Sequence, residues 1–186
     1  GVAIADEFAA LGAEVTLVLG PSHQKPLQKQ VSVIAVESAN DMLEACQAVF
    51  ANVNIAVLSA AVADYRPKNV SATKIKKKEG ELSLDLVKTP DILETLGKQK
   101  KKQVLAGFAL ETDNILDYAK AKIAKKNLDL IVANSATEKG AGFGVDTNKI
   151  TIIDKHNKLY NFELKSKQEV AKDIVTFIIN YLNKNV

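Results

Sequence analysis

A segment of small and polar residues directly after a short apolar run carries the side chains best suited to chemistry in this sequence. Residues 55–58 are apolar, and residues 59–67 read Ser-Ala-Ala-Val-Ala-Asp-Tyr-Arg-Pro. Buried strands of a parallel sheet are continuous apolar runs, and ligands bind where such strands end. Residues 74–78 then add four lysines in five positions. The two segments together predict a pocket for a polyanionic ligand at the end of a strand.

Two further segments offer groups that bind anions. Thr89, Pro90 and Asp91 have the residue types of a helix start, with Thr89 as the capping hydroxyl. The free amides and partial positive charge of such a start favour phosphate. Lys122 and Lys126 are four residues apart, so on a helix they lie on one face and can point toward the same anion. Each signal is weak alone, but together they favour a nucleoside triphosphate over a neutral ligand.

Strands that alternate with helices must position these groups. Apolar periodicity and turn residues predict helices at 2–12, 38–50, 89 onward, 113–126 and 166–181, strands at 14–19, 31–36, 55–58, 82–87, 104–106 and 128–133, and a hairpin formed by 150–153 and 159–164. Gly140 to Gly144 reads as a loop rather than a phosphate cradle, because no helical pattern follows it.

This order of elements predicts an α/β fold. We expect a Rossmann-like three-layer sandwich with a mainly parallel sheet and a C-terminal hairpin plus helix, forming a single domain over residues 1–186. A doubly wound domain normally begins with a strand and a glycine-rich turn. This sequence starts inside its first helix, so we expect the first strand to be missing and the domain to be truncated at its N-terminus.

Composition excludes several classes of protein. Of the 186 residues, 47% are hydrophobic and 25% are charged, a balance typical of a globular domain. No apolar stretch approaches the about 18 residues of a membrane span, and no secretory signal is evident. The net charge of +3 is too small by itself to indicate a nucleic-acid partner. Cys46 is the single cysteine and fits a helical core position, and the two histidines cannot build a zinc site, so we expect the cytoplasm.

Five motifs occur in order along nearly the whole chain. They are A-A-V-A-D-Y-R-P at 60–67, K-I-K-K at 74–77, K-T-P-D-I-L at 88–93, G-F-A-L-E-T at 107–112 and K-N-L-D-L-I-V-A-N at 126–134. With these motifs at this spacing, the chain resembles the phosphopantothenoylcysteine synthetases of coenzyme A biosynthesis. Bacterial members of that family are often the C-terminal half of a protein whose N-terminal half is a flavin-dependent decarboxylase.

The resemblance implies a ligase that joins 4′-phosphopantothenate to L-cysteine. Bacterial members use CTP, whose α-phosphate is attacked by the substrate carboxylate to give an acyl-cytidylate, and the cysteine amine then displaces CMP. Mg²⁺ is expected on the phosphates and water, with no protein ligand to the metal. The resemblance also implies a homodimer, and it places FMN only in a separate decarboxylase domain.

The resemblance also implies the residues of the site. Lys74 is expected to be catalytic, by stabilising charge on the phosphates, and Asn134 is expected at the rim of the substrate pocket. The expected nucleotide contacts are Ser59, Ala60, Ala61, Asp64, Lys74, Pro90, Asp91, Ile92, Leu93, Phe108, Lys122 and Lys126.

Simpler interpretations stand beside these. Asp64 and Asn134 are also typical turn residues, Phe108 is also a core residue, and Lys76, Lys77 and Lys78 fit a solvated loop. The family's opening strand and glycine-rich block, which carries an asparagine of the site, is absent, so this chain alone is expected to turn over poorly. Two other functions remain open: a non-catalytic nucleotide-binding module, although no G-x-G-x-x-G is present, and a dimerisation domain attached to a flavoprotein.

Overall fold

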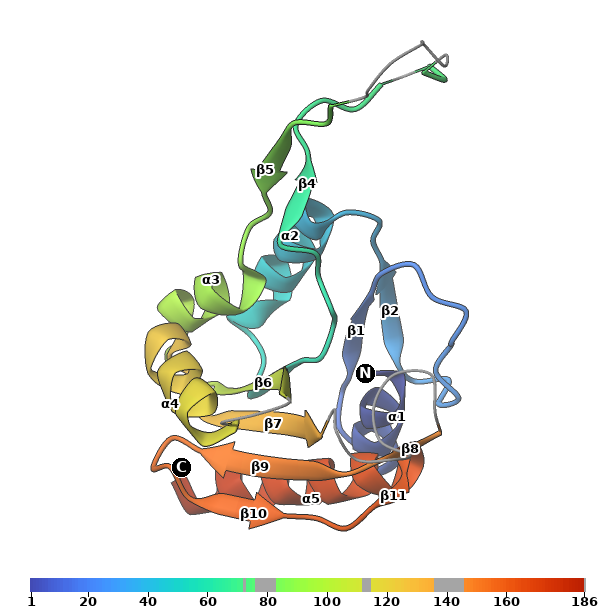
Figure 1. Cartoon of the computed structure of the whole chain (residues 1–186). Helices are drawn as coiled ribbons and strands as arrows, with labels where there is room; N and C mark the ends of the chain where they lie inside the picture. Colours follow the sequence, from blue (N-terminus) through green and yellow to red (C-terminus); the bar gives the residue numbers. More distant parts are fainter. Residues whose placement is uncertain (72, 76–82, 112–114, 136–145, 186) are drawn as a thin grey trace.

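The structure, a computed structural model, describes residues 1–71, 73–75, 83–111, 115–135 and 146–185. Within these ranges it is an α/β sandwich in which helices cover both faces of a sheet (Figure 1). The predictions for Lys76, Lys77 and Lys78, for the strand start at 82, for the helix start at 113 and for the Gly140–Gly144 loop lie outside the described residues.

The central sheet has five strands. They are β3 (Ile55–Leu58), β6 (Val104–Glu111), β7 (Leu130–Ser135), β9 (Ile150–Asp154) and β10 (Leu159–Asn161), in the spatial order β10-β9-β7-β6-β3. The strands β3, β6 and β7 are parallel, whereas β9 is antiparallel to β7 and β10 is antiparallel to β9. This arrangement confirms the predicted mainly parallel sheet and the C-terminal hairpin.

A second, smaller parallel pair lies beside this sheet. It consists of β1 (Thr16–Leu19) and β2 (Ser32–Ala35), which are paired in register from Thr16–Ser32 to Leu19–Ala35. Among the described strands, β1 pairs only with β2, and β3 pairs only with β6. Each of these two strands therefore keeps one open edge.

Two helical layers bury the two faces of the central sheet. On one face, α1 (Val2–Ala10) and α5 (Lys167–Asn185) pack over Val104, Ala106 and other strand residues. On the other face, α2 (Ala39–Phe50), α3 (Ile92–Gln99) and α4 (Ile115–Lys126) pack over Leu105 and its neighbours. The residues on the α1 and α5 face form a first hydrophobic cluster, and those on the α2, α3 and α4 face form a second one. Successive strand residues alternate between these two clusters, as the two-residue period of a strand requires. The predicted three-layer sandwich is thus confirmed, and Cys46 is half-buried against the second cluster.

Local capping signals fix where the helices begin. The Ser38 hydroxyl accepts the Asp41 N–H while the Asp41 carboxylate accepts the Ser38 N–H, which closes a capping box at α2. Ser166 and Glu169 form the same reciprocal pair before α5, as predicted. The prediction that Thr89 caps α3 is wrong. The cap is Asp91, whose carboxylate accepts the Glu94 N–H at 2.9 Å.

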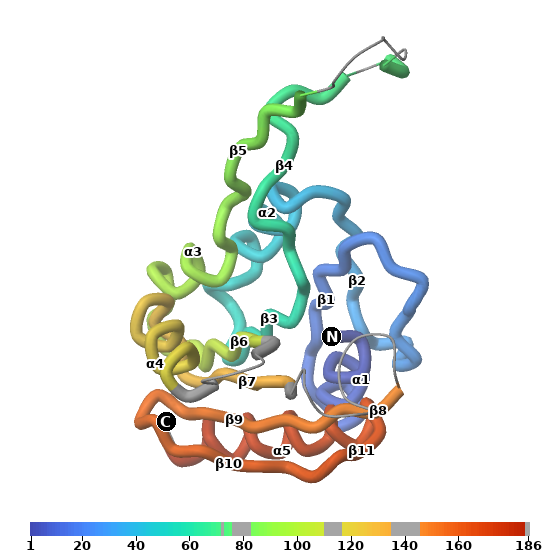
Figure 2. The backbone as a smooth tube through the Cα atoms, in the orientation of Figure 1, coloured from blue at the N-terminus to red at the C-terminus, as the bar shows by residue number. Residues whose placement is uncertain are grey.

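A two-stranded arm projects away from the body of the domain (Figures 1 and 2). It is formed by β4 (Tyr65–Pro67) and β5 (Leu86–Lys88), which are antiparallel. The predicted strand at 82–87 is shorter in the described residues, and its pairing with 65–67 has no local sequence signal. The arm exposes large apolar side chains, namely Tyr65, Val70, Ile75, Leu84 and Leu86.

One further sheet is very small: β8 (Thr147–Asn148) pairs antiparallel with β11 (Lys165–Ser166) at the start of α5. Among the described helices, none combines the length and the apolar character needed to cross a membrane.

The contact between α3 and α4 depends on a glycine. A Cβ atom at Gly97 would lie 1.9 Å from the backbone oxygen of Lys126. Asn127, which follows α4 with a φ of 51°, donates its side-chain amide to the Gly97 oxygen at 2.9 Å. The two helices can therefore approach this closely only with glycine at position 97.

Replacing Gly97 with alanine should lower the free energy of unfolding by about 1–3 kcal/mol, although alanine has the higher helix propensity, because the new methyl group must displace a backbone carbonyl. Urea unfolding measures the change. Gly20→Ala is the matched control, since a Cβ at Gly20 would meet only the Met42 methyl group, at 3.5 Å. Equal effects of the two substitutions would contradict the α3–α4 contact.

Candidate functional site

The start of α3 forms the centre of the candidate site. The Asp91 carboxylate accepts the Glu94 N–H, and the Asp91 main-chain carbonyl oxygen accepts both the amide and the hydroxyl of Thr95. The first four amides of a helix have no partner within the helix. The Asp91 carboxylate satisfies that of Glu94, and the Thr95 amide already makes the first regular bond of the helix. Among the described residues this leaves the N–H groups of Ile92 and Leu93 as donors for an incoming anion.

An ion pair joins α4 to this helix start. The Lys126 Nζ lies 2.6 Å from the Asp91 Oδ2, and the Lys126 side chain is only 17% exposed. Partial burial of the Asp91 carboxyl disfavours its ionised form, but the hydrogen bond and charge of Lys126 and the Glu94 N–H outweigh this effect and lower the pKa of Asp91. A positive group is thus held beside the amides of the first turn of α3.

A second lysine of α4 reaches the central sheet at β6. The Lys122 Nζ donates to the Phe108 carbonyl oxygen at 3.0 Å, near the middle of β6. Lys122 and Lys126 therefore project from the same helix face, one toward β6 and the other toward α3. The four-residue spacing places the two ammonium groups one turn apart, but each contacts a different partner, so their convergence on one anion stays a prediction.

The segment after β3 is tied to the same helix start. The Thr89 N–H donates to the main-chain carbonyl oxygen of Asp64 at 2.9 Å, and the Thr89 hydroxyl donates to the main-chain carbonyl oxygen of Ala63. Thr89, which follows β5, therefore connects to the segment just before β4 instead of capping α3. Ala60, Ala61 and Asp64 are exposed in this segment. At its start, Gly1 lies so close to Ser59 that a Cβ at Gly1 would stand 2.9 Å from the Ser59 hydroxyl oxygen.

Three of the predicted nucleotide contacts have side chains that belong to the core. Ile92 and Leu93 are buried in the second cluster, and Phe108 packs against the first. Gly107 packs against Leu93, whose Cδ2 would have to shift to make room for a Cβ at Gly107, since the two would lie 2.8 Å apart. Any contact that Ile92 and Leu93 make with a ligand is therefore through their backbone. Pro90 is half-buried just before the helix.

Lys74, the predicted catalytic residue, is not brought to these groups. It is exposed, and the described residues 73–75 lie at the tip of the arm, away from the body (Figure 2). The role of Lys74 thus stays a prediction.

Asn134 lies near the end of β7 and has a partner that the sequence did not indicate. Asn148, which is buried on β8, donates its side-chain amide to the Asn134 Oδ1 at 3.0 Å and accepts the Lys149 N–H. The Asn134 side chain is therefore oriented from a strand that begins 13 positions later in the sequence. No local pattern around Thr147–Asn148 could have identified this contact.

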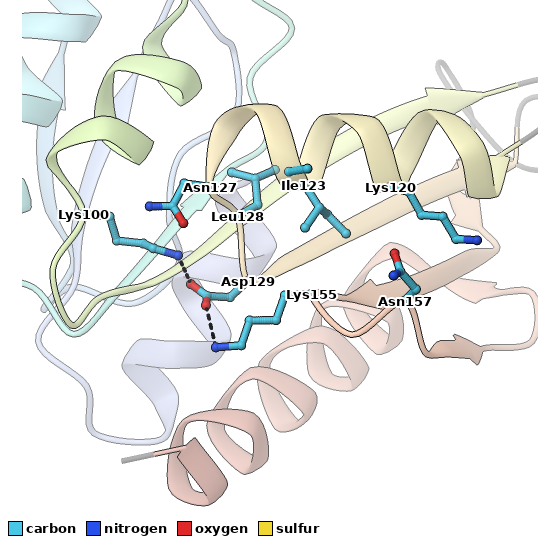
Figure 3. Close-up of a pocket in the computed structure, with 9 residues that line it drawn as sticks. Lys100, Lys120, Ile123, Asn127, Leu128, Asp129, Lys155 and Asn157 are labelled. Atoms are coloured by element: carbon cyan, nitrogen blue, oxygen red, sulfur yellow. Dashed lines mark hydrogen bonds and ion pairs between the residues drawn. The ribbon is translucent and has the colours of Figure 1, made fainter.

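A cavity that is open to solvent lies at the other end of the parallel strands (Figure 3). It is lined by residues that precede β6 and β7 and by the turn after β9, among them Lys100, Asp129 and Lys155, and has a volume of about 500 Å³. None of the predicted site residues lines it. The candidate site described above lies apart from this cavity.

Comparison with known proteins gives one consistent result. Residues 1–182 match the family described as the DNA/pantothenate metabolism flavoprotein C-terminal domain. A solved structure, the C-terminal domain of the coenzyme A biosynthesis bifunctional protein CoaBC, superposes with a TM-score of 0.83 at 42% identity. The match covers 99% of this chain and 84% of that one.

Two curated relatives are similar along almost the whole chain. A cysteine/cysteine sulfinic acid decarboxylase from an unknown prokaryotic organism is 52% identical over 184 residues, which cover 98% of this chain and 51% of the relative. The bifunctional protein CoaBC of Bacillus subtilis (strain 168) is 45% identical over 175 residues, which cover 94% of this chain and 43% of the relative. This chain spans about half the length of these relatives. It belongs to the DNA/pantothenate metabolism flavoprotein C-terminal domain family.

Proposed function

We propose that this domain is a phosphopantothenate–cysteine ligase of coenzyme A biosynthesis, with CTP as the activating nucleotide. The observation that carries the proposal is the placement of Lys126 on the Asp91 cap, beside the open amides of α3, with Lys122 one turn earlier on the same helix and directed toward β6. The similarity to two proteins, the CoaBC of Bacillus subtilis and a solved CoaBC C-terminal domain, supports it. A more distant solved structure, a Cab2 variant in complex with phosphopantothenate-cysteine, has the same fold at 16% identity.

The chemistry requires a site that neutralises a crowded anion. In the first step, a carboxylate oxygen of 4′-phosphopantothenate attacks the α-phosphorus of CTP, and the bond to the β-phosphate breaks to release pyrophosphate. In the second step, the amine of L-cysteine attacks the acyl carbon, the bond to CMP breaks, and the amine loses a proton. Positioned cations stabilise the charge that develops in the first transition state.

Each group of the site has a part in this scheme. The N–H groups of Ile92 and Leu93 and the Lys126 ammonium bind the phosphates, and the Asp91 carboxylate holds Lys126 in place before the nucleotide arrives. Ser59 to Ala61 and Asp64 offer the exposed backbone and side-chain groups after β3 to the nucleotide. Mg²⁺, when bound, would neutralise part of the phosphate charge and would need few protein ligands. Asn134, oriented by Asn148, forms the rim of the pocket.

A decarboxylase activity belongs to a different part of the relatives. One relative is named a cysteine/cysteine sulfinic acid decarboxylase, but this chain matches only 51% of its length. We propose that any flavin-dependent decarboxylation resides in a separate domain, with FMN bound there. The alternative function of this domain, a non-catalytic dimerisation or nucleotide-binding unit beside that flavoprotein, predicts no CTP-dependent catalysis.

We also propose that the domain forms a homodimer through the β4–β5 arm. Leu84 and Leu86 are 63% and 56% exposed, just before and at the start of β5 in the two-stranded arm. Two isolated strands are marginally stable in water, and clustered exposed apolar side chains are typical of an interaction surface. A second copy of the arm would bury these side chains by a symmetric contact.

CTP should raise the melting temperature of the domain, because a ligand that binds only the folded state stabilises it. Replacing either Lys122 or Lys126 with glutamine should weaken CTP binding by about tenfold, or ~1.4 kcal/mol, through the loss of a charged contact to phosphate. Lys172→Gln, an equal loss of charge from an exposed position on α5 in the other helical layer, is the control. A larger shift with ATP than with CTP would contradict the nucleotide assignment, and no shift with either would favour the dimerisation unit.

Lys74→Gln should reduce kcat by about 100-fold, the loss expected when one group that stabilises transition-state charge is removed. The assay follows CMP release by a version extended upstream with the family's strand and glycine-rich block, because the resemblance assigns an asparagine of the site to that block. The matched control is Lys68→Gln, an exposed lysine on the same arm. An unchanged kcat in the Lys74 variant, or equal losses in both variants, would remove Lys74 from the mechanism.

The double substitution Leu84→Asp and Leu86→Asp should convert the dimer to a monomer, since four charges would have to be buried at a symmetric contact. Sedimentation velocity measures the mass in solution. Leu27→Asp is the control, because Leu27 is 86% exposed at a site away from the arm. A dimer that survives the arm substitutions would show that the interface lies elsewhere.

A further inference from the structure

The cavity at the amino-terminal end of the parallel strands has features that the proposed reaction does not use. It adjoins a second cavity of about 630 Å³, and both are lined by Lys100, Asp129 and Lys155. Figure 3 shows Lys100 near one end of the first cavity, and Lys120 with Asn157 near the other. The lining residues come from four separate segments, namely the end of α3, residues 120–124 of α4, the segment just before β7 and the β9–β10 turn.

A buried carboxylate fixes the middle of this cavity. The Asp129 side chain is 9% exposed, and one of its oxygens accepts both the Leu105 N–H and the Lys100 Nζ at 2.9 Å. Its other oxygen lies 3.5 Å from the Lys155 Nζ. Asp129 therefore accepts a backbone N–H near the start of β6 and pairs its single negative charge with two lysines.

The positive charge around the two cavities is in excess. Their lining contains five lysines, namely Lys100, Lys101, Lys102, Lys120 and Lys155, and Asp129 is the only acidic residue there. Within the described part of the chain, Lys101, Lys102 and Lys120 form no ion pair. Five lysines against one aspartate leave an excess of four positive charges.

Helix ends account for only part of this charge. Basic residues are favoured where a helix ends, and Lys100 to Lys102 follow α3. Lys120 lies in the middle of α4, however, and Lys155 lies in the turn after β9. Neither residue lies at the end of a helix, where a basic side chain would offset the partial negative charge of the helix dipole. Both side chains nevertheless line the same cavity. The gathering of lysines from unrelated elements around one hollow is the feature that needs a function.

We propose that this cavity is a second anion site, which binds the phosphate or pyrophosphate group of a small phosphorylated molecule. Its volume lies in the range of small-molecule pockets, and lysine ammonium groups suit a compact polyvalent anion because each offers three rotatable donors. Lys155 is the primary contact, beside Lys100, which Asp129 holds in place, and Lys120 extends the positive charge to the opposite end of the cavity (Figure 3). The site is separate from Lys122 and Lys126, which lie at the candidate nucleotide site.

Titration of the chain with pyrophosphate, followed by the backbone amide signals in ¹H–¹⁵N NMR spectra, tests the site directly. Ionic strength is kept constant with sodium chloride so that general screening does not change. The amides of residues 127–129 and 155–158 should shift saturably. The double variant Lys120→Gln and Lys155→Gln should weaken the affinity read from these amides by at least about tenfold.

The charge-matched control is Lys25→Gln with Lys29→Gln, two exposed lysines far from the cavity in the sequence. This control should bind with an affinity close to that of the unsubstituted chain. The spectra also report whether each variant is folded. Absent or unsaturable shifts at 127–129 and 155–158, or equal affinities of the pocket variant and the control, would overturn the site. Shifts at residues 59–61 and 91–94 report the nucleotide site and do not enter the outcome.

Discussion

The close approach of α3 to α4 is the contact on which the candidate site depends. Gly97 lets the Lys126 carbonyl come within a distance that any side chain would block, and Asn127 closes the contact through the Gly97 oxygen. Once the helices are held there, Lys126 lies on the Asp91 cap of α3 and Lys122 reaches β6. Packing at one end of the helix pair thus sets the position of charges at the start of α3.

The two ends of the parallel strands carry different chemistry. After β3 and around the start of α3, the structure offers exposed backbone and open amides beside lysines of α4. Before β6 and β7, a buried aspartate organises lysines around a cavity. The same helix, α4, contributes Lys122 and Lys126 to the first region and Lys120 to the second, so both regions depend on its position.

Signals confined to a few neighbouring residues were sufficient for much of the fold. The capping boxes at Ser38 and Ser166 and the apolar period of α5 gave helix starts and buried faces that the structure confirms. Contacts between distant segments were not predictable in this way. Thr89 bonds to Ala63 instead of capping α3, β5 pairs with β4 as an arm, and Asn148 reaches Asn134. The lysines of the second cavity likewise come together only through tertiary folding.

The central claim is that groups around α3 and α4 hold a nucleoside triphosphate for attack at its α-phosphorus. Phosphorus NMR of the upstream-extended protein with CTP and 4′-phosphopantothenate, but without cysteine, tests it most directly. The account predicts pyrophosphate together with a mixed anhydride of the substrate carboxylate and CMP. Release of CDP, with transfer of the terminal phosphate to the carboxylate, would contradict it.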